Sequence, residues 1–251
     1  MAFCQVQWHS KVLGKALGLN AILPEVGEPP YPVFYLLHGL SDDHTIWHRR
    51  TRIEWYVRNL PLIVVMPDGF RGFYTNHENG PAFATYMAEE LPAFVERTFP
   101  ARRDRGGRCI GGLSMGGYGA LRLALGYPEV YASVNSHSGA LAFGHDPLQL
   151  NTSFSREWQL VIGETPAGSA HDLFALAAAR HQEDNAPAIR IDCGSEDFLI
   201  EPNRRFAAHL KAIGLDHEYA EFPGAHSWDY WDLHIQEALQ FHAKNLGIVP
   251  A

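Results

Sequence analysis

One stretch of this sequence constrains the fold more than any other part of it. Residues 112–116 read Gly-Leu-Ser-Met-Gly, with a short apolar run before them and a helical pattern of small residues after them. A serine between two glycines at this spacing is typical of a sharp turn from a strand into a helix, where the serine takes strained backbone angles. Cβ atoms at Gly112 and Gly116 would collide with neighbouring backbone, and glycine permits that close approach. The stretch therefore predicts a strand, a tight turn and a helix, with Ser114 presented at the turn.

Two polar residues far downstream complete a pattern around this serine. Asp197 follows a strand-like run at residues 188–193, and His226 lies in the loop after another run at 217–222. A serine, then an acid, then a histidine, each after a strand, is the order found in hydrolases with a nucleophile elbow. A glycine-rich turn alone fits many folds, whereas this order indicates catalysis. The sequence thus predicts a catalytic triad of Ser114, Asp197 and His226.

Other residues compete for two of these roles. Asp192 lies inside the predicted strand, which keeps its side chain from the loop face, and Glu196 directly precedes Asp197. Asp197 lies beyond the strand end and is followed by Phe-Leu, so it is favoured over both of the other acids. His137 competes as the base, but it follows the serine before any acid-bearing strand. We interpret His137 as pocket lining.

The loop after an early apolar strand supplies a second part of the predicted site. Residues 33–37 form a continuous apolar run that ends in His38 and Gly39. An early strand ending in His-Gly matches the loop that gives a backbone N–H to the oxyanion in such hydrolases. We therefore expect the backbone N–H groups of Leu40 and Met115 to form the oxyanion hole.

Aromatic and histidine side chains near the predicted strand ends are candidates for a substrate pocket. The loop at residues 70–81 is rich in aromatic residues, which either line a pocket for the acyl or alcohol group or simply cover the core. The candidates from this loop and from the other strand-end segments are His38, Trp47, Tyr74, His137 and Trp228.

Apolar runs that read as strands alternate with helical patterns along the chain. The expected strands lie within residues 3–23, before Ser114, and at 33–37, 62–66, 131–134, 188–193 and 217–222. The expected helices lie at 45–59, 83–98 with an interruption or kink at Pro92, 115–125, 170–180, 203–213 and 228–246, the last capped by Asp229 and Asp232. This alternation predicts a mostly parallel sheet covered by helices on both faces. Together with the strand, serine turn and helix around residues 112–116, it indicates the α/β-hydrolase fold.

Length and composition favour one domain. With 251 residues, of which 46% are hydrophobic, the chain is long enough for one large α/β domain with an ample core. We expect a single domain over residues 1–251, with a cap-like excursion at about 141–169. An ordinary surface excursion would look the same in the sequence.

Charge, hydropathy and cysteine usage narrow the function classes. A net charge of −8 gives no basic surface for nucleic acid or anionic lipid, and no apolar run is long enough to span a membrane. The first ten residues lack a secretory signal and the three cysteines are far apart, so we expect reduced thiols and a cytoplasmic protein. His44 and His48 have helical spacing but no third ligand at motif distance, so we expect no metal and no cofactor. Whether the chain forms a homo-oligomer stays open.

Four stretches resemble the esterase D family of α/β-hydrolases. They are residues 35–40, 111–120, 192–199 and 224–228. The family includes S-formylglutathione hydrolases, bacterial tributyrin esterases, feruloyl and acetyl-xylan esterases, and mycobacterial mycolyltransferases. The chain is most similar to the small tributyrin-esterase branch. The resemblance implies a serine carboxylesterase that acts on a small-molecule substrate, a short-chain acyl ester, through an acyl-enzyme intermediate.

Other activities remain open from the residues alone. A thioesterase acting on S-formylglutathione, or a feruloyl or acetyl esterase, would use the same residues. An acyltransferase needs an acceptor alcohol that outcompetes water, and a non-catalytic binding domain can share the fold. Residues 141–169 match no branch clearly, so the sequence leaves the substrate undecided.

Overall fold

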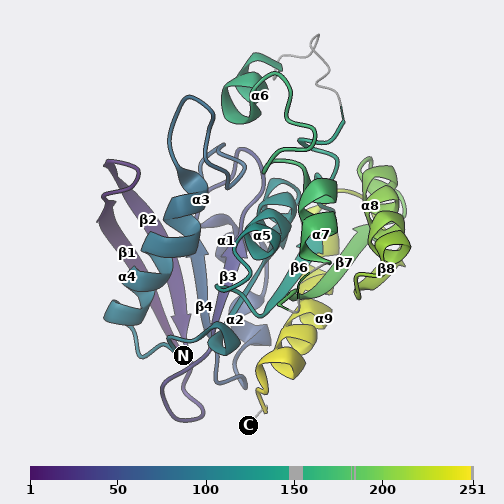
Figure 1. Ribbon diagram of the computed structural model, residues 1–251. Helices are drawn as coiled ribbons and strands as arrows, with labels where there is room; N and C mark the ends of the chain where they lie inside the picture. Colours follow the sequence, from purple (N-terminus) through teal and green to yellow (C-terminus); the bar gives the residue numbers. More distant parts are fainter. Residues whose placement is uncertain (147–154, 182, 184, 250–251) are drawn as a thin grey trace.

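The described part of the chain folds around an eight-stranded sheet (Figure 1). The computed structural model describes residues 1–146, 155–181, 183 and 185–249. The strands are β1 (Ala2–Ser10), β2 (Lys15–Leu23), β3 (Val33–Leu37), β4 (Ile63–Pro67), β5 (Arg108–Leu113), β6 (Ser133–His137), β7 (Ala188–Gly194) and β8 (Glu218–Phe222). Their spatial order is β1-β2-β4-β3-β5-β6-β7-β8. β2 runs antiparallel to both of its neighbours, and all other neighbouring strands run parallel.

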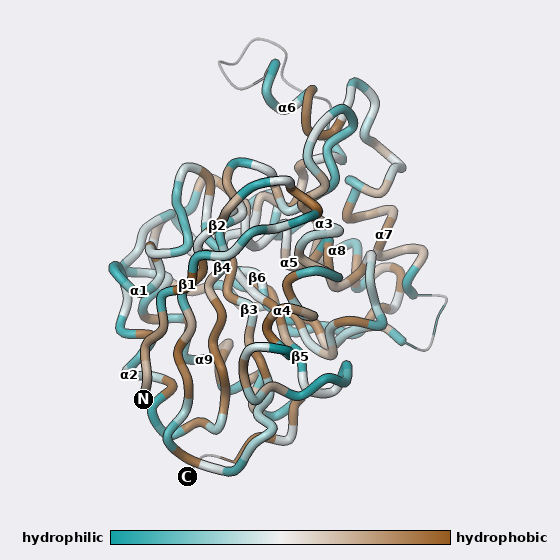
Figure 2. Tube along the Cα trace, turned by 90° about the vertical axis from the view of Figure 1, so that its left-hand side faces the viewer, coloured by the Kyte–Doolittle hydropathy of each residue, from teal (hydrophilic) through white to brown (hydrophobic). Residues whose placement is uncertain are grey.

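Helices cover both faces of this sheet. They are α1 (Ile46–Arg50), α2 (Ile53–Tyr56), α3 (Phe83–Thr85), the π-helical turn η1 (Tyr86–Glu90), α4 (Leu91–Thr98), the 3₁₀ turn η2 (Arg105–Gly107), α5 (Met115–Gly126), α6 (Ser155–Ile162), α7 (Leu173–Arg180), α8 (Ile200–Ile213) and α9 (Trp228–Leu246). α3, α4, α5, α7 and α8 contribute to the core on one face, while α1, α2 and α9 form the core on the other. In the side view of Figure 2, the strands run between α1 and α2 on one side and α5 and α7 on the other.

The central strand sequences explain why two helix layers are needed. β3 and β4 are buried along their whole length. Val33, Tyr35 and Leu37 belong to the core on the α5 side. Phe34 and Leu36 belong to the core on the α9 side. Strands that are apolar on both faces require a cover on both, so the predicted mostly parallel, doubly covered sheet is confirmed.

The single helix predicted for residues 45–59 is instead two short helices, α1 and α2. The Thr51 hydroxyl donates a hydrogen bond to the backbone oxygen of Trp47 at 2.6 Å, and the extended backbone of Thr51 ends α1. The next backbone N–H, that of Arg52, donates to Oδ1 of Asp232 at 2.7 Å. Helix α1 therefore ends where Asp232, on the distant helix α9, accepts the backbone N–H of Arg52. The local sequence pattern does not reveal this partner.

Asp232 serves this contact and does not cap α9, so that prediction was wrong. Its carboxylate also accepts hydrogen bonds from the Arg52 guanidinium at 2.9 Å and from the Tyr56 hydroxyl at 3.2 Å. The N-cap residue of α9 is Ser227, not Asp229. Asp229 lies in the first turn, where a negative charge favours the positive end of the helix dipole. The C-terminal helix is thus tied to α2 by a charged contact.

Two further element boundaries differ in detail from the prediction. The helix predicted over 83–98 is interrupted, as expected, but by the π-helical turn η1, and Pro92 lies in the first turn of α4. The helical backbone is continuous through η1, where the N–H of Leu91 bonds the backbone oxygen of Tyr86, so the π-helical turn directly precedes the proline that cannot donate to the ladder. β6 covers Ser133–His137 rather than residues 131–134, so His137 is the last residue of a strand.

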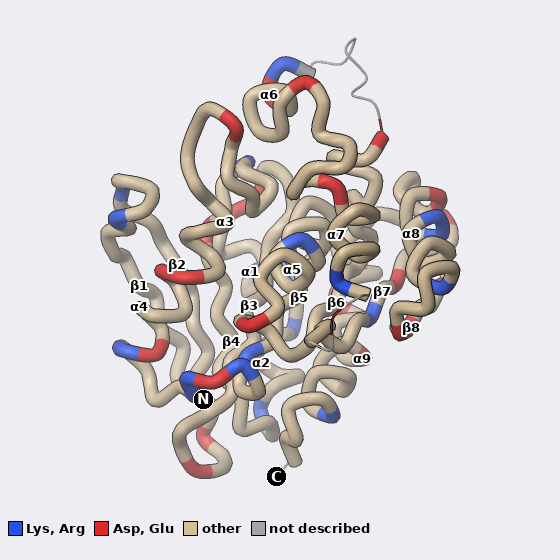
Figure 3. The backbone as a smooth tube through the Cα atoms, viewed as in Figure 1, with Lys and Arg blue, Asp and Glu red and all other residues tan. Residues whose placement is uncertain are grey.

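Acidic and basic residues are interspersed along the backbone in the view of Figure 3. Many of them pair, as in the contact between Arg204 and Glu221 at 2.7 Å. Within the ranges that the structure describes, no helix combines the length and the apolar character needed to cross a membrane.

Candidate active site

The loops that follow β5, β7 and β8 meet at one edge of the sheet. β5 to β8 are consecutive parallel neighbours, so their carboxyl ends lie on the same side. Ser114 follows β5 directly, Asp197 follows β7, and His226 follows β8. Ligands of open α/β sheets bind outside the carboxyl ends of the strands. The structure therefore brings all three predicted triad residues to the edge where chemistry is expected.

Ser114 occupies a strained turn between β5 and α5. Its φ of 54° and ψ of −116° are angles that non-glycine residues rarely adopt. Its backbone N–H donates to the oxygen of His137 at 3.0 Å, which fastens the turn to β6. A Cβ on Gly112 or on Gly116 would lie 2.6 Å from the backbone oxygen of Leu37. The two glycines thus permit the close approach of β3 that the turn requires.

Gly116→Ala is expected to lower the free energy of unfolding by about 3 kcal/mol, because its neighbours are backbone atoms that cannot swing aside. The new Cβ would lie 2.6 Å from the oxygen of Leu37 and 2.7 Å from that of His38. Gly126→Ala, at the other end of the same helix, is the matched control, since a Cβ there meets nothing within 4 Å. We expect this control to change the stability by less than about 1 kcal/mol. Urea unfolding measures both variants, and equal stabilities would contradict the steric argument.

His226 and Asp197 form a hydrogen-bonded pair. Nδ1 of His226 lies 2.9 Å from Oδ2 of Asp197 and 3.1 Å from Oδ1. Burial alone would raise the pKa of Asp197, but hydrogen bonds from His226, from a backbone N–H and from a serine hydroxyl outweigh it and lower the pKa. Asp197 is therefore ionised at neutral pH, and a carboxylate only accepts hydrogen bonds, so Nδ1 of His226 carries a proton. In the neutral imidazole, Nε2 then keeps its lone pair and is available as a base.

Ser138 adjoins both Asp197 and Trp231, a position that the sequence did not reveal. Its hydroxyl helps to lower the pKa of Asp197 and accepts a hydrogen bond from Nε1 of Trp231 at 3.2 Å. Ser138 directly follows His137, the residue whose backbone oxygen accepts from the N–H of Ser114. Only its position after the strand next to the turn could have marked Ser138 in the sequence.

Ser114 borders a largely apolar cavity of about 480 Å³. The lining consists of Leu40, Phe73, Ser114, Met115, Ala140, Ala142, Phe143, Gly144, Asp146, Trp158, Phe198, Leu199 and Pro202. Leu40 and Met115, the predicted oxyanion donors, thus line the same cavity as the serine. Met115 is the first residue of α5, and N–H groups at a helix start have no partner within the helix. The cavity is in the size range of small-molecule sites.

His226 lies at the edge of this cavity. Its ring is 4.5 Å from that of Phe198, which lines the cavity together with Ser114. Trp231 meets the imidazole edge-on at 4.8 Å, so packing and hydrogen bonding together orient the ring. In the part of the chain that the structure describes, the side-chain hydrogen bonds of His226 go to Asp197 and none joins it to Ser114. Catalytic hydrogen bonds of this kind often tighten only when substrate binds.

Backbone strain gathers at the same edge of the sheet. Among the described residues, those other than glycine with positive φ are Ser41, Phe70, Phe73, Tyr74, Ser114 and Ser138. All six lie in segments that follow the carboxyl ends of β3, β4, β5 and β6. Such conformations cost about 1 kcal/mol or more each and cluster at functional sites.

None of the five predicted pocket residues lines the cavity. His38, Tyr74 and His137 are at most 1% exposed. Nε2 of His38 accepts the N–H of Gly69 at 2.9 Å, and the Tyr74 hydroxyl donates to the backbone oxygen of His38 at 2.9 Å. These side chains hold the strand-end loops together instead of facing a substrate, a correction that follows from their burial.

Trp47 and Trp228 likewise belong to a packed aromatic cluster. Trp228 meets Trp47 edge-on at 5.3 Å and Trp231 edge-on at 5.2 Å. Nε1 of Trp47 donates to the backbone oxygen of Leu37 at 2.9 Å. Because Trp231 contacts the ring of His226, this aromatic cluster packs against the imidazole and helps to hold its orientation.

The acids that competed with Asp197 are engaged elsewhere. Asp192 is fully buried; Nδ1 of His137 lies 2.8 Å from its Oδ1, and the Tyr230 hydroxyl donates to its Oδ2 at 3.0 Å. Glu196 is exposed. Among the described hydrogen bonds of His226, neither acid is a partner.

His44 and His48, the two histidines at helical spacing, contact different parts of the protein. His44 lies against Gly18, and His48 stacks on Phe3 with ring centroids 4.1 Å apart. Within the described ranges, no three His, Cys, Asp or Glu side chains are grouped so that they could hold a metal ion.

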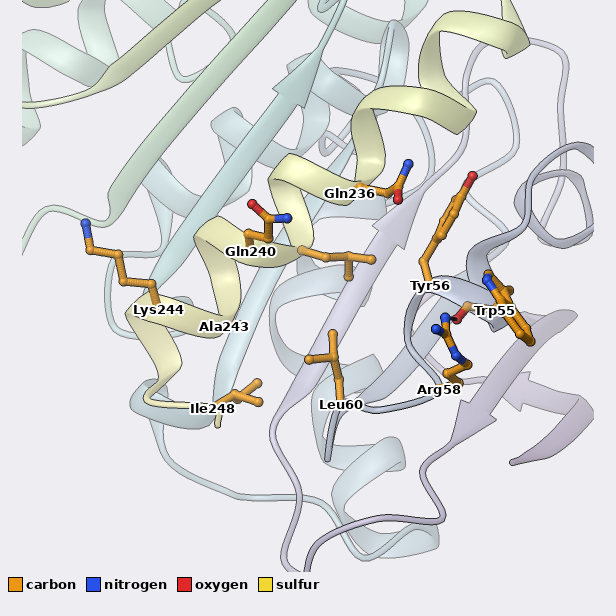
Figure 4. A pocket seen from close by; sticks show the side chains of 10 residues that line it. Trp55, Tyr56, Arg58, Leu60, Gln236, Gln240, Ala243, Lys244 and Ile248 are labelled. Atoms are coloured by element: carbon orange, nitrogen blue, oxygen red, sulfur yellow. Dashed lines mark hydrogen bonds between the residues drawn. The ribbon is translucent and has the colours of Figure 1, made fainter. Parts of the chain in front are cut away.

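A second groove of about 560 Å³ opens between α2 and α9, where Figure 4 shows Tyr56, Gln236 and Gln240 around it. Trp55, Arg58 and Lys244 also line it. The residues that the structure describes along this groove include no serine, cysteine or histidine, so it lacks the groups for nucleophilic catalysis.

Comparison with known proteins identifies the family of the chain. The model of the Esterase family matches residues 10–242. The chain is 32% identical to an acetyl esterase of Caldicellulosiruptor saccharolyticus, over 97% of this chain and 99% of that protein. Its fold is similar to that of FphF, a fluorophosphonate-binding serine hydrolase of Staphylococcus aureus, with a TM-score of 0.87, 30% identity, and coverage of 96% of this chain and 98% of that one. It is also similar to FrmB, an S-formylglutathione hydrolase of the same organism, with a TM-score of 0.85, 31% identity and the same coverage. The chain therefore belongs to the Esterase family and is a serine hydrolase of carboxylic esters with the α/β-hydrolase fold.

Proposed function

We propose that Ser114, His226 and Asp197 form the catalytic triad of a carboxylesterase for short-chain acyl esters. The observation that carries the proposal is the strained turn that presents Ser114 to an apolar cavity shared with Leu40 and Met115. The hydrogen-bonded pair of His226 and Asp197 at the edge of that cavity supports it. The acyl group of a small ester occupies the cavity, and the alcohol leaves from its mouth.

Acylation needs a base, an oriented imidazole and donors for the oxyanion. Oγ of Ser114 attacks the ester carbonyl carbon while Nε2 of His226 takes the hydroxyl proton. Asp197, ionised and hydrogen-bonded to Nδ1, stabilises the imidazolium that forms. The backbone N–H groups of Leu40 and Met115 bind the carbonyl oxygen as it becomes negative, each lowering the barrier by about 3 kcal/mol.

Acylation ends when the imidazolium of His226 protonates the leaving alkoxide, so the ester C–O bond breaks and an acyl-serine remains. Deacylation then uses the same groups, with water as the nucleophile. Nε2 then takes a proton from water, which attacks the acyl carbon through a second oxyanion. Collapse of that intermediate releases the carboxylic acid and returns the proton to Ser114.

A series of p-nitrophenyl esters from acetate to dodecanoate tests the substrate class. Phe73, Phe143 and Trp158 bound the cavity next to the serine. Because these rings limit the length of the acyl group, we expect kcat/KM to fall by about tenfold or more between butyrate and dodecanoate. Steady-state kinetics gives the two constants for each ester. A kcat/KM that rises with chain length throughout would contradict the assignment to short acyl groups.

A thioesterase activity on S-formylglutathione is the second candidate. The 31% identity to an S-formylglutathione hydrolase favours it, and the same triad serves a thioester. Measuring S-formylglutathione beside p-nitrophenyl acetate separates the two candidates. A kcat/KM for the thioester far above that for the ester would make the thioesterase the function of this site.

The domain organisation and the cellular compartment are proposals as well. Participation of strands from residue 2 to residue 222 in the same sheet supports a single domain over 1–251. Trp158 of α6 borders the cavity, which supports a cap-like role for the excursion at 141–169, of which 147–154 lie outside the described residues. The free thiols of Cys4, Cys109 and Cys193 agree with the reducing cytoplasm.

A further inference from the structure

One guanidinium connects two walls of the cavity. Arg71 lies in the loop after β4. Its Nε and Nη2 donate to the two carboxylate oxygens of Glu157 on α6, at 2.6 and 2.7 Å. Its Nη1 donates to the hydroxyl of Ser41. A bidentate pair of charge-assisted hydrogen bonds is the strongest and most directional contact that an arginine makes, and a lysine cannot reproduce it.

Each end of this bridge adjoins the cavity. Ser41 follows Leu40 in the chain, and Glu157 precedes Trp158; both Leu40 and Trp158 line the cavity. Trp158 in turn meets the ring of Phe143, another lining residue, edge-on at 5.8 Å. A displacement of either partner of the guanidinium is therefore passed to a residue that faces the substrate.

The contact with Glu157 is partly sheltered, whereas the contact with Ser41 is exposed. The side chain of Arg71 is 24% exposed and that of Glu157 is 35% exposed, so water screens the pair only in part. The hydrogen bonds from Arg71 lower the pKa of Glu157, which keeps this carboxylate charged at neutral pH. Ser41 has a φ of 71°, a conformation that needs support from its neighbours.

We propose that Arg71 is a positioning residue for the esterase reaction. Through Ser41 it fixes the loop that carries the N–H of Leu40, and through Glu157 it fixes the α6 wall that bounds long acyl groups. This inference rests on the proposed function. Oxyanion donation acts on the transition state of every ester, whereas the α6 wall touches only acyl groups long enough to reach it. The two contacts therefore have separable kinetic effects.

The test compares p-nitrophenyl acetate with p-nitrophenyl octanoate in three variants. Ser41→Ala is expected to lower kcat about fivefold for both esters and to leave both KM values within about twofold. Glu157→Gln is expected to raise KM about fivefold for octanoate, and to leave kcat and KM for acetate within about twofold. Arg71→Gln is expected to show both effects together, because it removes both contacts.

Arg204→Gln is the matched control. Arg204 also makes a bidentate contact, to Glu221 at 2.8 and 2.7 Å, but it does not line the cavity. We expect all four constants of this variant to stay within about twofold of the wild type. Melting temperatures of all variants show that the kinetic changes are not caused by unfolding.

An unchanged kcat in Ser41→Ala, or an unchanged or lowered octanoate KM in Glu157→Gln, would overturn the inference. These two variants test the contacts one at a time, so the outcome does not depend on whether Arg71→Gln folds. An active wild type with unaffected variants overturns the role of Arg71 alone. A wild type that cleaves neither ester overturns the proposed function as well.

Discussion

Ser114→Ala is expected to lower kcat for p-nitrophenyl acetate by about 10⁵-fold. The variant lacks the atom that forms the acyl-enzyme, and no other hydroxyl or thiol lines the described cavity. The backbone donors remain, so a small rate above that of water persists. Steady-state kinetics of the purified variant measures the loss, and a fluorophosphonate probe is expected to label the wild type and not the variant.

Ser195→Ala is the control for this experiment. Ser195 is an exposed serine in the loop after β7 and takes no part in the cavity. We expect its kcat to match that of the wild type. Turnover by Ser114→Ala within tenfold of the wild type would remove the basis for the proposed mechanism.

Asp197→Asn is expected to lower kcat by about 10⁴-fold with little change in KM. An amide at this position donates a hydrogen bond to Nδ1 of His226, so the imidazole proton moves to Nε2 and the base is lost. The measurement is kcat for p-nitrophenyl acetate at pH 7. Glu196→Gln is the matched control, because Glu196 is the exposed neighbour in the same loop.

Asp192→Asn distinguishes the role of Asp192 from that of Asp197. Asp192 accepts a hydrogen bond from Tyr230 and contacts His137, away from His226, so its replacement is expected to lower the melting temperature more than kcat. A larger loss of kcat in Asp192→Asn than in Asp197→Asn would reverse the assignment of the acid.

The lowered pKa of Asp197 also links stability to pH. Because the folded pKa lies below the unfolded value of about 3.9, the charged carboxylate stabilises the fold above that pH. This contribution is lost as the pH falls through the lowered pKa. Asp197→Asn should therefore reduce the loss in the free energy of unfolding as the pH falls below about 4. A group with a raised pKa would show the opposite dependence and would stabilise the fold at low pH.

The sequence predicted those parts of the fold that depend on local chemistry. The two glycines around Ser114 and the apolar runs of β3 and β4 were sufficient to expect the turn and the doubly covered sheet. Strand ends could be placed because parallel strands bring their following loops to one edge. For this reason the order of residues along the chain is enough to single out Ser114, Asp197 and His226.

Contacts between distant segments could not be predicted in the same way. The break between α1 and α2 depends on Asp232, 180 positions away from Arg52 in the chain. Ser138 carries no motif, and its role exists only because Trp231 and Asp197 meet its hydroxyl.

The predicted pocket residues do not line the cavity, again because contacts between distant segments decide where their side chains lie. His38, Trp47 and His137 belong to types that line substrate sites as readily as they fill a core, and only packing decides between these outcomes. Their positions in the sequence placed them near the strand ends but not on the cavity wall. Periodicity reports which face of an element is buried, not what the buried side chain meets.

The cluster of positive-φ residues around the strand ends has an evolutionary consequence. At about 1 kcal/mol each, six such residues amount to a sizeable fraction of the net stability of a typical domain, about 5–15 kcal/mol. Substitutions that relax these angles would favour heat resistance, while selection for turnover retains them. Thermotolerant descendants of this chain are therefore expected to gain stabilising substitutions in the helix layers and in the hairpin of β1 and β2. The positive-φ residues at the sheet edge that carries Ser114 are expected to keep their strained angles.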